Sequence, residues 1–240
     1  MKALTETEYK GYKLFFYDNK YENVLKKIAD NNIKLTEEYK NTQRNYVAKI
    51  SHKGRDYVLK SPRNEFRIPQ RKFFTLFKGG EAVETLKNIN NLKEKGLDIF
   101  AMPLGAVVRR KYGMITESHI IFEMAEGEAV LKNKHRAVEA TKEMHKYGVY
   151  HGDCNPSNFI ITENGVKVID TQAKKMHFGN YRAHYDMVTM KMDSYKEMKY
   201  PYKKNIFYYI VLMVKYLKRN PIVAKIKKNK KILRDKGWKI

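Results

Sequence analysis

The chain has 240 residues, which is enough for one domain with a sizeable core or for two small lobes. Its 49 Lys and Arg against 26 Asp and Glu give a net charge of +23, while 42% hydrophobic and 12% aromatic residues are typical of a folded protein. A single Cys excludes an internal disulfide framework and a cysteine-based zinc site, and it fits a reducing compartment.

Neither the N-terminus nor the apolar runs predict a membrane or secretory segment. The first ten residues, MKALTETEYK, contain no apolar run and therefore predict no secretory signal. The longest apolar run, Ile206 to Val214, is too short to cross a bilayer core of about 30 Å. We expect a cytoplasmic protein that is attracted to anionic surfaces.

The first half of the sequence predicts strands with two helices between them. Apolar periodicity and turn residues place the elements, in chain order, as a strand at 12–17, a helix at 21–29, a β-hairpin of 46–50 with 55–60, a helix at 81–95, and a strand pair of 107–112 with 119–124. Gly96 supplies the stop signal for the second helix.

The second half is predicted to be mostly helical. A break at 126–128 divides the chain into an N-lobe of residues 1–125 and a C-lobe of residues 126–240. The C-lobe begins with a helix at 136–147, continues with a hairpin of 159–162 and 166–169 across Asn164-Gly165, and is helical from residue 182 onward.

Much of the positive charge lies at the C-terminal end. Residues 196–240 contain 15 Lys or Arg against two acids, together with apolar residues at helical spacing: Ile206, Tyr209, Ile210, Met213 and Leu217. One interpretation is a helix docked on the domain with its basic face in solvent. The other is a patch for an anionic membrane surface or ligand, with a basic stretch at 225–236 beyond the helix. We do not expect nucleic acid as a partner, because no binding motif accompanies the charge.

The stretch HGDCNPSNFII at 151–161, followed by VKVID at 166–170, carries the clearest chemical signal. His151, Asp153 and Asn158 occupy a polar loop between a helix and a strand, and the short hairpin can return Asp170 to the side of Asn158. Two carboxylates and an amide in one small volume supply oxygen ligands that suit Mg²⁺, and whichever carboxylate is not used as a ligand can accept a hydroxyl proton.

The order H-x-D-x₄-N, an apolar hairpin and then Asp resembles the catalytic signature of the protein-kinase-like fold. The resemblance implies an α+β, two-lobed protein with a small β-rich N-lobe and a mostly helical C-lobe. It also implies ATP and Mg²⁺ as cofactors. Asp153 matches the catalytic base, and Asn158 and Asp170 match the metal ligands.

The upstream residues extend this resemblance. Lys60, which ends the YVLK strand at 57–60, matches the phosphate-binding lysine, and its expected partner is Glu84, with Glu81 as the alternative. Residues 122–125 occupy the position of the hinge, where Glu123 and Ala125 would hold adenine. Asp186 resembles the buried Asp that braces the catalytic loop.

Several departures point away from a eukaryotic-type protein kinase. The chain has no G-x-G-x-x-G loop, so we expect the turn at 42–45 to cover the phosphates. Thr171 and Gln172 stand where Phe-Gly would follow Asp170, and Asn155 stands in place of the catalytic-loop lysine. These differences favour a kinase of carbohydrates or small substrates. Cys154, beside the base, is interpreted as a packing residue.

The whole chain resembles the bacterial lipopolysaccharide core heptose(II) kinase family. The matching features are GYKLFFYDNKY at 11–21, YVLK, Lys78-Gly79, the GDx₄NFI core, Ile169-Asp170 and the basic C-terminus. The family implies transfer of the ATP γ-phosphate to a heptose of the lipopolysaccharide inner core, at the cytoplasmic face of the inner membrane.

Two alternatives stay open from the sequence. One is a kinase of another acceptor, such as another core sugar, a protein or an aminoglycoside, although the charge of +23 argues against a cationic antibiotic. The other is a non-catalytic kinase-fold module that binds an anionic membrane or nucleic acid. The set of Lys60, Asp153, Asn158 and Asp170 argues against the second alternative.

Overall fold

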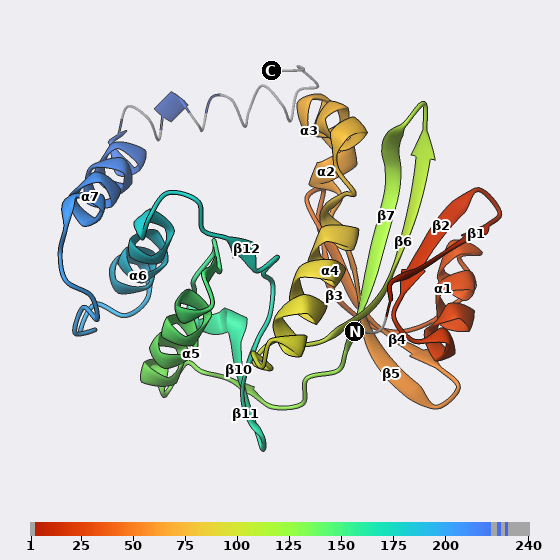
Figure 1. Ribbon diagram of the computed structural model, residues 1–240, viewed down its shortest axis with the longest axis horizontal. Coiled ribbons are helices and arrows are strands. Elements are labelled where there is room, and N and C mark those ends of the chain that lie inside the picture. Colours follow the sequence, from red (N-terminus) through yellow and green to blue (C-terminus); the bar gives the residue numbers. More distant parts are fainter. Residues whose placement is uncertain (1–2, 222–224, 227–228, 230–240) are drawn as a thin grey trace.

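The computed structural model describes residues 3–221, 225–226 and 229. It has a β-rich N-terminal part and a mostly helical C-terminal part, which confirms the predicted α+β fold (Figure 1). The strands are β1 (Thr5–Tyr9), β2 (Tyr12–Phe16), β3 (Lys34–Asn41), β4 (Tyr46–His52), β5 (Arg55–Ser61), β6 (Pro103–Lys111), β7 (Met114–Glu123), β8 (Glu128–Ala129), β9 (Val149–Tyr150), β10 (Phe159–Thr162), β11 (Gly165–Val168) and β12 (Lys174–Lys175). The helices are α1 (Glu22–Ala29), α2 (Asn64–Arg67), α3 (Pro69–Phe74), α4 (Glu81–Glu94), α5 (Lys134–Lys146), α6 (Tyr181–Asp193) and α7 (Ile206–Arg219).

The N-terminal sheet is antiparallel throughout, in the strand order β1-β2-β6-β7-β5-β4-β3. Successive residues of its central strands alternate between two buried layers, as the two-residue period of a strand requires. On β2, Leu14 and Phe16 pack with α1, whereas Phe15 packs with α4 on the opposite face. The sheet is therefore covered on both sides, and α4 lies on the side that faces the C-terminal part (Figure 1).

The C-terminal part has its own buried core, built mainly from α5, α6 and the β10–β11 hairpin. Two residues of α4, Ile89 and Leu92, also belong to this core. The segment after α4 pairs with β11, since the Ala101 N–H donates to the Val168 carbonyl at 3.0 Å. Helix α4 and the chain that follows it thus connect the sheet to the hairpin that ends at the candidate site.

The structure confirms most of the predicted strands and helices and adds others, among them two strands and two short helices in the N-terminal part. The added strands β1 and β3 are the two edges of the sheet, and β3 is exposed along its whole length. Edge strands bury little, so their sequences are polar and lack the apolar alternation that identified the inner strands. The short helices α2 and α3 were also not predicted, and β7 begins at Met114, earlier than expected.

Helix α7 forms where it was predicted, but its apolar stripe is exposed, which contradicts the interpretation that this stripe docks on the domain. Ile206, Tyr209 and Met213 are 71%, 60% and 57% exposed, whereas Val211 and Lys215 are buried. The Lys215 ammonium lies 3.1 Å from Asp193 of α6, so the helix packs through its other side. The predicted basic stretch at 225–236 lies mostly outside the described residues. Within the described part of the chain, no helix is both long and apolar enough to cross a membrane.

Candidate active site

The loop at 151–153 is held by a buried carboxylate. Asp186 of α6 is fully buried and accepts hydrogen bonds from the backbone N–H groups of His151 (2.7 Å) and Gly152 (3.0 Å). Charge-assisted hydrogen bonds of this kind are stronger than those between neutral groups. The predicted bracing role of Asp186 is confirmed, and the loop presents Asp153 at the protein surface.

His151 and Cys154 are the buried members of the same loop. His151 packs against Phe159, with ring centroids 5.3 Å apart, and its Nδ1 accepts the Asp153 N–H at 3.3 Å. Burial lowers the pKa of the His151 imidazole, so the ring is neutral near pH 7. Burial likewise raises the pKa of the Cys154 thiol, which lies 3.2 Å from the Thr141 hydroxyl. Both side chains therefore pack within the loop, as predicted for Cys154.

The β10–β11 hairpin brings Asn158 and Asp170 to the same place. Its strands pair in register from Phe159 opposite Val168, and the Ile169 N–H donates to the Asn158 carbonyl at 2.9 Å. The Asn158 amide nitrogen donates to the Asp153 carbonyl at 2.9 Å. The hairpin thus joins the loop that carries Asp153 to the residue that precedes Asp170.

Lys60 enters the site from the N-terminal sheet. Its ammonium lies 2.5 Å from Asp170 Oδ1, across a sequence separation of 110 residues. In the described part of the chain Lys60 forms its ion pair with Asp170, and the structure does not bring Glu81 or Glu84 to it. Glu84 lies in the first turn of α4, close to Gly79.

The donor set at this point suits a hard divalent cation. Because the Asn158 amide nitrogen is engaged by Asp153, its oxygen is the atom left to act as a ligand beside the Asp170 carboxylate. Mg²⁺ is commonly bound by one or two carboxylates together with waters and substrate phosphates. In the described residues there is no cluster of three or more His, Cys, Asp or Glu that could form a complete protein cage for a metal. The residues present therefore fit Mg²⁺ that is shared with a phosphate ligand.

The segment after Asp170 is anchored without a Phe-Gly pair. The Thr171 hydroxyl donates to the His151 carbonyl at 3.1 Å, and Asn88 of α4 donates to the Gln172 carbonyl at 3.1 Å. Asp170 itself adopts a left-handed backbone with φ 55°, a conformation that costs a non-glycine residue about 1 kcal/mol. The two anchors keep the Asp170 carboxylate directed at Lys60 in spite of this cost.

The turn at 42–45, predicted to cover the phosphates, is fixed by arginines from α2 and the residue before it. The Arg63 guanidinium donates to Asn41 Oδ1 (2.8 Å) and to the Thr42 carbonyl (3.0 Å). Arg67 donates to both the backbone carbonyl and the side chain of Gln43. The sequence analysis missed these two arginines, since α2 is a single short helix without an apolar face.

The predicted hinge is rigidly joined to the neighbouring strand. The Glu123 N–H donates to the Met102 carbonyl at 2.9 Å, and the Glu123 carboxylate accepts the Met102 N–H at 3.0 Å. A hollow of about 800 Å³ is lined by the linker that contains Glu123 and Ala125, by the tip of the β10–β11 hairpin and by Lys93. Neither Lys60 nor Asp170 lines this hollow. The linker therefore lines a hollow that does not include the Lys60–Asp170 pair.

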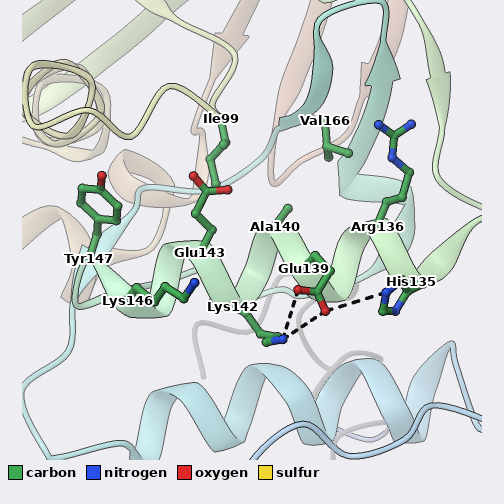
Figure 2. Close-up of a pocket in the computed structure, with 10 residues that line it drawn as sticks. All are labelled: Ile99, His135, Arg136, Glu139, Ala140, Lys142, Glu143, Lys146, Tyr147 and Val166. Carbon is green, nitrogen blue, oxygen red and sulfur yellow. Dashed lines mark hydrogen bonds and ion pairs between the residues drawn. The ribbon is translucent and has the colours of Figure 1, made fainter.

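A second hollow, of about 580 Å³, lies along α5 and contains none of the predicted site residues (Figure 2). Figure 2 shows Glu139 between Lys142 and His135, at 3.1 Å and 3.9 Å respectively. Since none of the predicted site residues reaches this hollow, we do not place the chemistry there.

Glu65 of α2 is a buried carboxylate that the sequence analysis did not single out. It accepts the backbone N–H of Glu81 at 2.6 Å, at the first residue of α4, and its second oxygen is buried without a hydrogen-bond partner among the described residues. Burial raises the pKa of Glu65 to about 7. The sequence around Glu65 shows no apolar periodicity that would predict its burial. The burial becomes evident only from the contact between α2 and the start of α4.

A lysine from the sheet, a carboxylate and an amide at one hairpin, and an exposed carboxylate on a braced loop define an ATP-dependent kinase of the protein-kinase-like class. Residues 3–229 match the family of the lipopolysaccharide core biosynthesis protein WaaY, and the chain belongs to this family. The family confirms the predicted kinase class and the predicted relation to lipopolysaccharide core synthesis.

Individual relatives are more distant. The lipopolysaccharide core heptose(II) kinase WaaY of Escherichia coli is 23% identical over 181 residues, which cover 71% of this chain and 78% of the relative. A solved structure of WaaP in complex with acyl carrier protein is similar with a TM-score of 0.45 and 17% identity, covering 85% of this chain and 84% of that one.

Proposed function

We propose that this kinase transfers the γ-phosphate of ATP to a heptose of the lipopolysaccharide inner core, with the second heptose as the acceptor. The observation that supports the reaction is the convergence of Lys60, Asn158 and Asp170 beside the loop of Asp153. The family and the E. coli relative support the acceptor.

Asp153 is proposed as the catalytic base. It is exposed, it forms no ion pair within the described residues, and its loop is fixed by Asp186. A carboxylate placed in this way can accept the proton of a sugar hydroxyl as that oxygen attacks the γ-phosphorus. The leaving group is then ADP, and the proton ends on Asp153. Most of the acceleration comes from orientation and charge stabilisation rather than from covalent chemistry.

Asn158 and Asp170 are the proposed ligands of Mg²⁺, which when bound would neutralise charge on the ATP phosphates. Lys60 is proposed to contact the α- and β-phosphates, and Glu84 to orient Lys60 when it turns from Asp170 to the nucleotide. The Glu123 carbonyl and the Ala125 N–H would supply the acceptor and the donor that the adenine edge requires.

We further propose that the lobes divide at residues 125 and 126, so that ATP binds between them. The acceptor is anionic and carried by lipid, and a net charge of +23 favours its encounter with the protein. On this account the enzyme acts at the cytoplasmic face of the inner membrane as a peripheral protein.

The acceptor is tested with purified lipopolysaccharide cores and γ-labelled ATP. We expect label on a core that carries two unphosphorylated heptoses and none on a core truncated after the first heptose. Mapping of the phosphate by mass spectrometry identifies the sugar. Equal labelling of both cores would assign the reaction to the first heptose, and labelling of neither core by a protein that binds ATP would remove the heptose assignment.

A further inference from the structure

Exposed aromatic side chains form a cluster at one end of the N-terminal sheet. Phe73, Phe74 and Phe77 are 54%, 49% and 74% exposed, and Tyr112 at the turn between β6 and β7 is 84% exposed. The phenyl rings contact one another at centroid distances of 6.1 and 6.0 Å. Helix α3 and the β6–β7 turn lie at the same end of the molecule (Figure 1). Exposed aromatic residues gathered in this way indicate an interaction surface.

The cluster stands on a fixed platform rather than on a loose loop. The Arg110 guanidinium donates to the carbonyls of Thr75 (2.8 Å), Lys78 (2.8 Å) and Gly113 (2.6 Å). The Thr75 hydroxyl accepts the Ile115 N–H at 2.9 Å, which joins the same two segments. The residues between α3 and α4 are thereby bound to the β6–β7 turn, and the aromatic side chains project from both.

The surroundings of the cluster are basic. Residues 66–80 and 103–116 contain Arg and Lys but no Asp or Glu. Arg71, Lys78 and Lys111 are exposed and Lys72 is partly exposed, and none of the four forms an ion pair within the described residues. Basic side chains around exposed aromatic rings are complementary to an anionic lipid interface, where rings enter the headgroup region and cations contact phosphates.

The exposed face of α7 is the rival surface, but its cations are engaged. Lys215 and Arg219 pair with Asp193, and Lys218 donates to the Tyr185 hydroxyl at 2.8 Å. The residues of the α3 cluster line neither of the two hollows described above, and their rings are exposed. Protruding rings with unpaired cations favour a membrane over a protein partner.

We propose that the surface formed by Phe73, Phe74, Phe77 and Tyr112, with the basic residues around it, docks the enzyme on an anionic bilayer. This surface extends the proposed function, because it would hold the enzyme beside a lipid-borne acceptor. It is independent of the nucleotide site, so the two proposals can fail separately.

The test is sedimentation of the full chain with phosphatidylcholine vesicles that contain about 30% phosphatidylglycerol. We expect the wild type to bind these vesicles, to bind pure phosphatidylcholine weakly, and to release with added salt. Phe73→Ser with Phe77→Ser should weaken binding by about tenfold or more, and Lys72→Glu with Lys78→Glu should do the same. Phe178→Ser is the matched control, because Phe178 is 76% exposed elsewhere, and it should bind as the wild type does.

Three results would overturn the proposal. They are wild-type protein that fails to bind the anionic vesicles, Phe73/Phe77 variants that bind normally, and loss of binding on Tyr209→Ser with Met213→Ser in α7 instead. Thermal unfolding and ATP affinity are measured on every variant, and both should match the wild type. If the protein does not bind vesicles but still transfers phosphate to a delipidated core, the docking proposal fails and the kinase assignment stands.

Discussion

The Lys60 ammonium lies 2.5 Å from Asp170 Oδ1, and this contact joins the N-terminal sheet to the hairpin of the catalytic loop. The lysine side chain is 17% exposed and the aspartate 40% exposed, so the pair is partly in contact with solvent rather than in the core. A pair in this position can separate when phosphate and metal provide stronger partners, because a partly solvated ion pair contributes only about 1 kcal/mol.

Asp170→Asn should abolish the dependence of ATP binding on Mg²⁺. Asparagine accepts the left-handed backbone that Asp170 adopts, so the fold should be kept, but the neutral amide is a poorer ligand for a hard cation. Titration calorimetry with and without Mg²⁺ measures the effect, and phosphate transfer should fall by about 100-fold or more. A variant that still binds ATP more tightly in Mg²⁺ would contradict the assignment of Asp170.

Asp186→Asn should destabilise the protein and slow the reaction. One of the two N–H groups that Asp186 accepts, from His151 and Gly152, would then face an amide NH₂ and lose its partner. An unsatisfied buried donor costs about 1–3 kcal/mol in the free energy of unfolding, which urea denaturation detects. Asp98→Asn, at an exposed carboxylate, is the control and should change stability little. Equal stability of the two variants would show that Asp186 does not brace the loop.

Arg67→Ala should weaken ATP binding more than it lowers the turnover rate. Without the contacts to Gln43, the turn at 42–45 keeps only the bonds from Arg63 and Asn64, so more of its ordering cost falls on nucleotide binding. We expect KM for ATP to rise about five- to tenfold with a smaller change in kcat. Arg55→Ala is the control variant, because Arg55 is exposed and lies at the end of β5 opposite to Lys60. An unchanged KM would exclude this turn from the nucleotide site.

The pKa of Glu65 predicts how stability changes with pH. Burial raises this pKa from 4.5 to about 7, so the folded protein binds more protons than the unfolded chain between these values. Stability therefore contains a contribution that is present at low pH and is lost as pH rises toward 7 and beyond. The charged groups that act on Glu65 are Glu81, which reinforces the shift, and Arg110 and Lys174, which oppose it.

Glu65→Gln removes this contribution while keeping an acceptor for the Glu81 N–H. The midpoint of thermal unfolding, measured between about pH 5.5 and pH 8, should fall less with rising pH in the variant than in the wild type. Glu163→Gln serves as the control, since Glu163 is exposed, forms no ion pair within the described residues and does not act on Glu65. Parallel pH profiles for the wild type and Glu65→Gln would contradict the raised pKa.

The sequence was most informative where local pattern and chemistry coincide. The Asn164-Gly165 turn predicts the register of the β10–β11 hairpin. In this register the chain returns at Asp170 beside Asn158. The helices α1, α4 and α5 followed from their apolar stripes. Edge strands β1 and β3 were missed because they bury little and need no apolar alternation.

Contacts between segments that are far apart in the sequence could not be predicted from local sequence patterns. The pairing of Lys60 with Asp170 rather than with a glutamate of α4 depends on how the sheet sits on the hairpin. The clamp of Arg63 and Arg67 on the turn at 42–45 depends on α2, whose four residues are too few to show a period. For α7, periodicity located the helix, but the buried side carries Val211 and Lys215 rather than the apolar stripe.

The most direct test of the account is single-turnover transfer of the γ-phosphate from Mg-ATP to core lipopolysaccharide by the wild type and by Asp153→Asn. The account predicts a transfer rate about 100- to 10,000-fold lower for Asp153→Asn, with ATP affinity unchanged, because only the base is lost. Asp56→Asn, at a surface carboxylate paired with Lys49, should transfer at the wild-type rate. Wild-type transfer by Asp153→Asn, or no transfer by a wild type that binds Mg-ATP and core, would contradict the account.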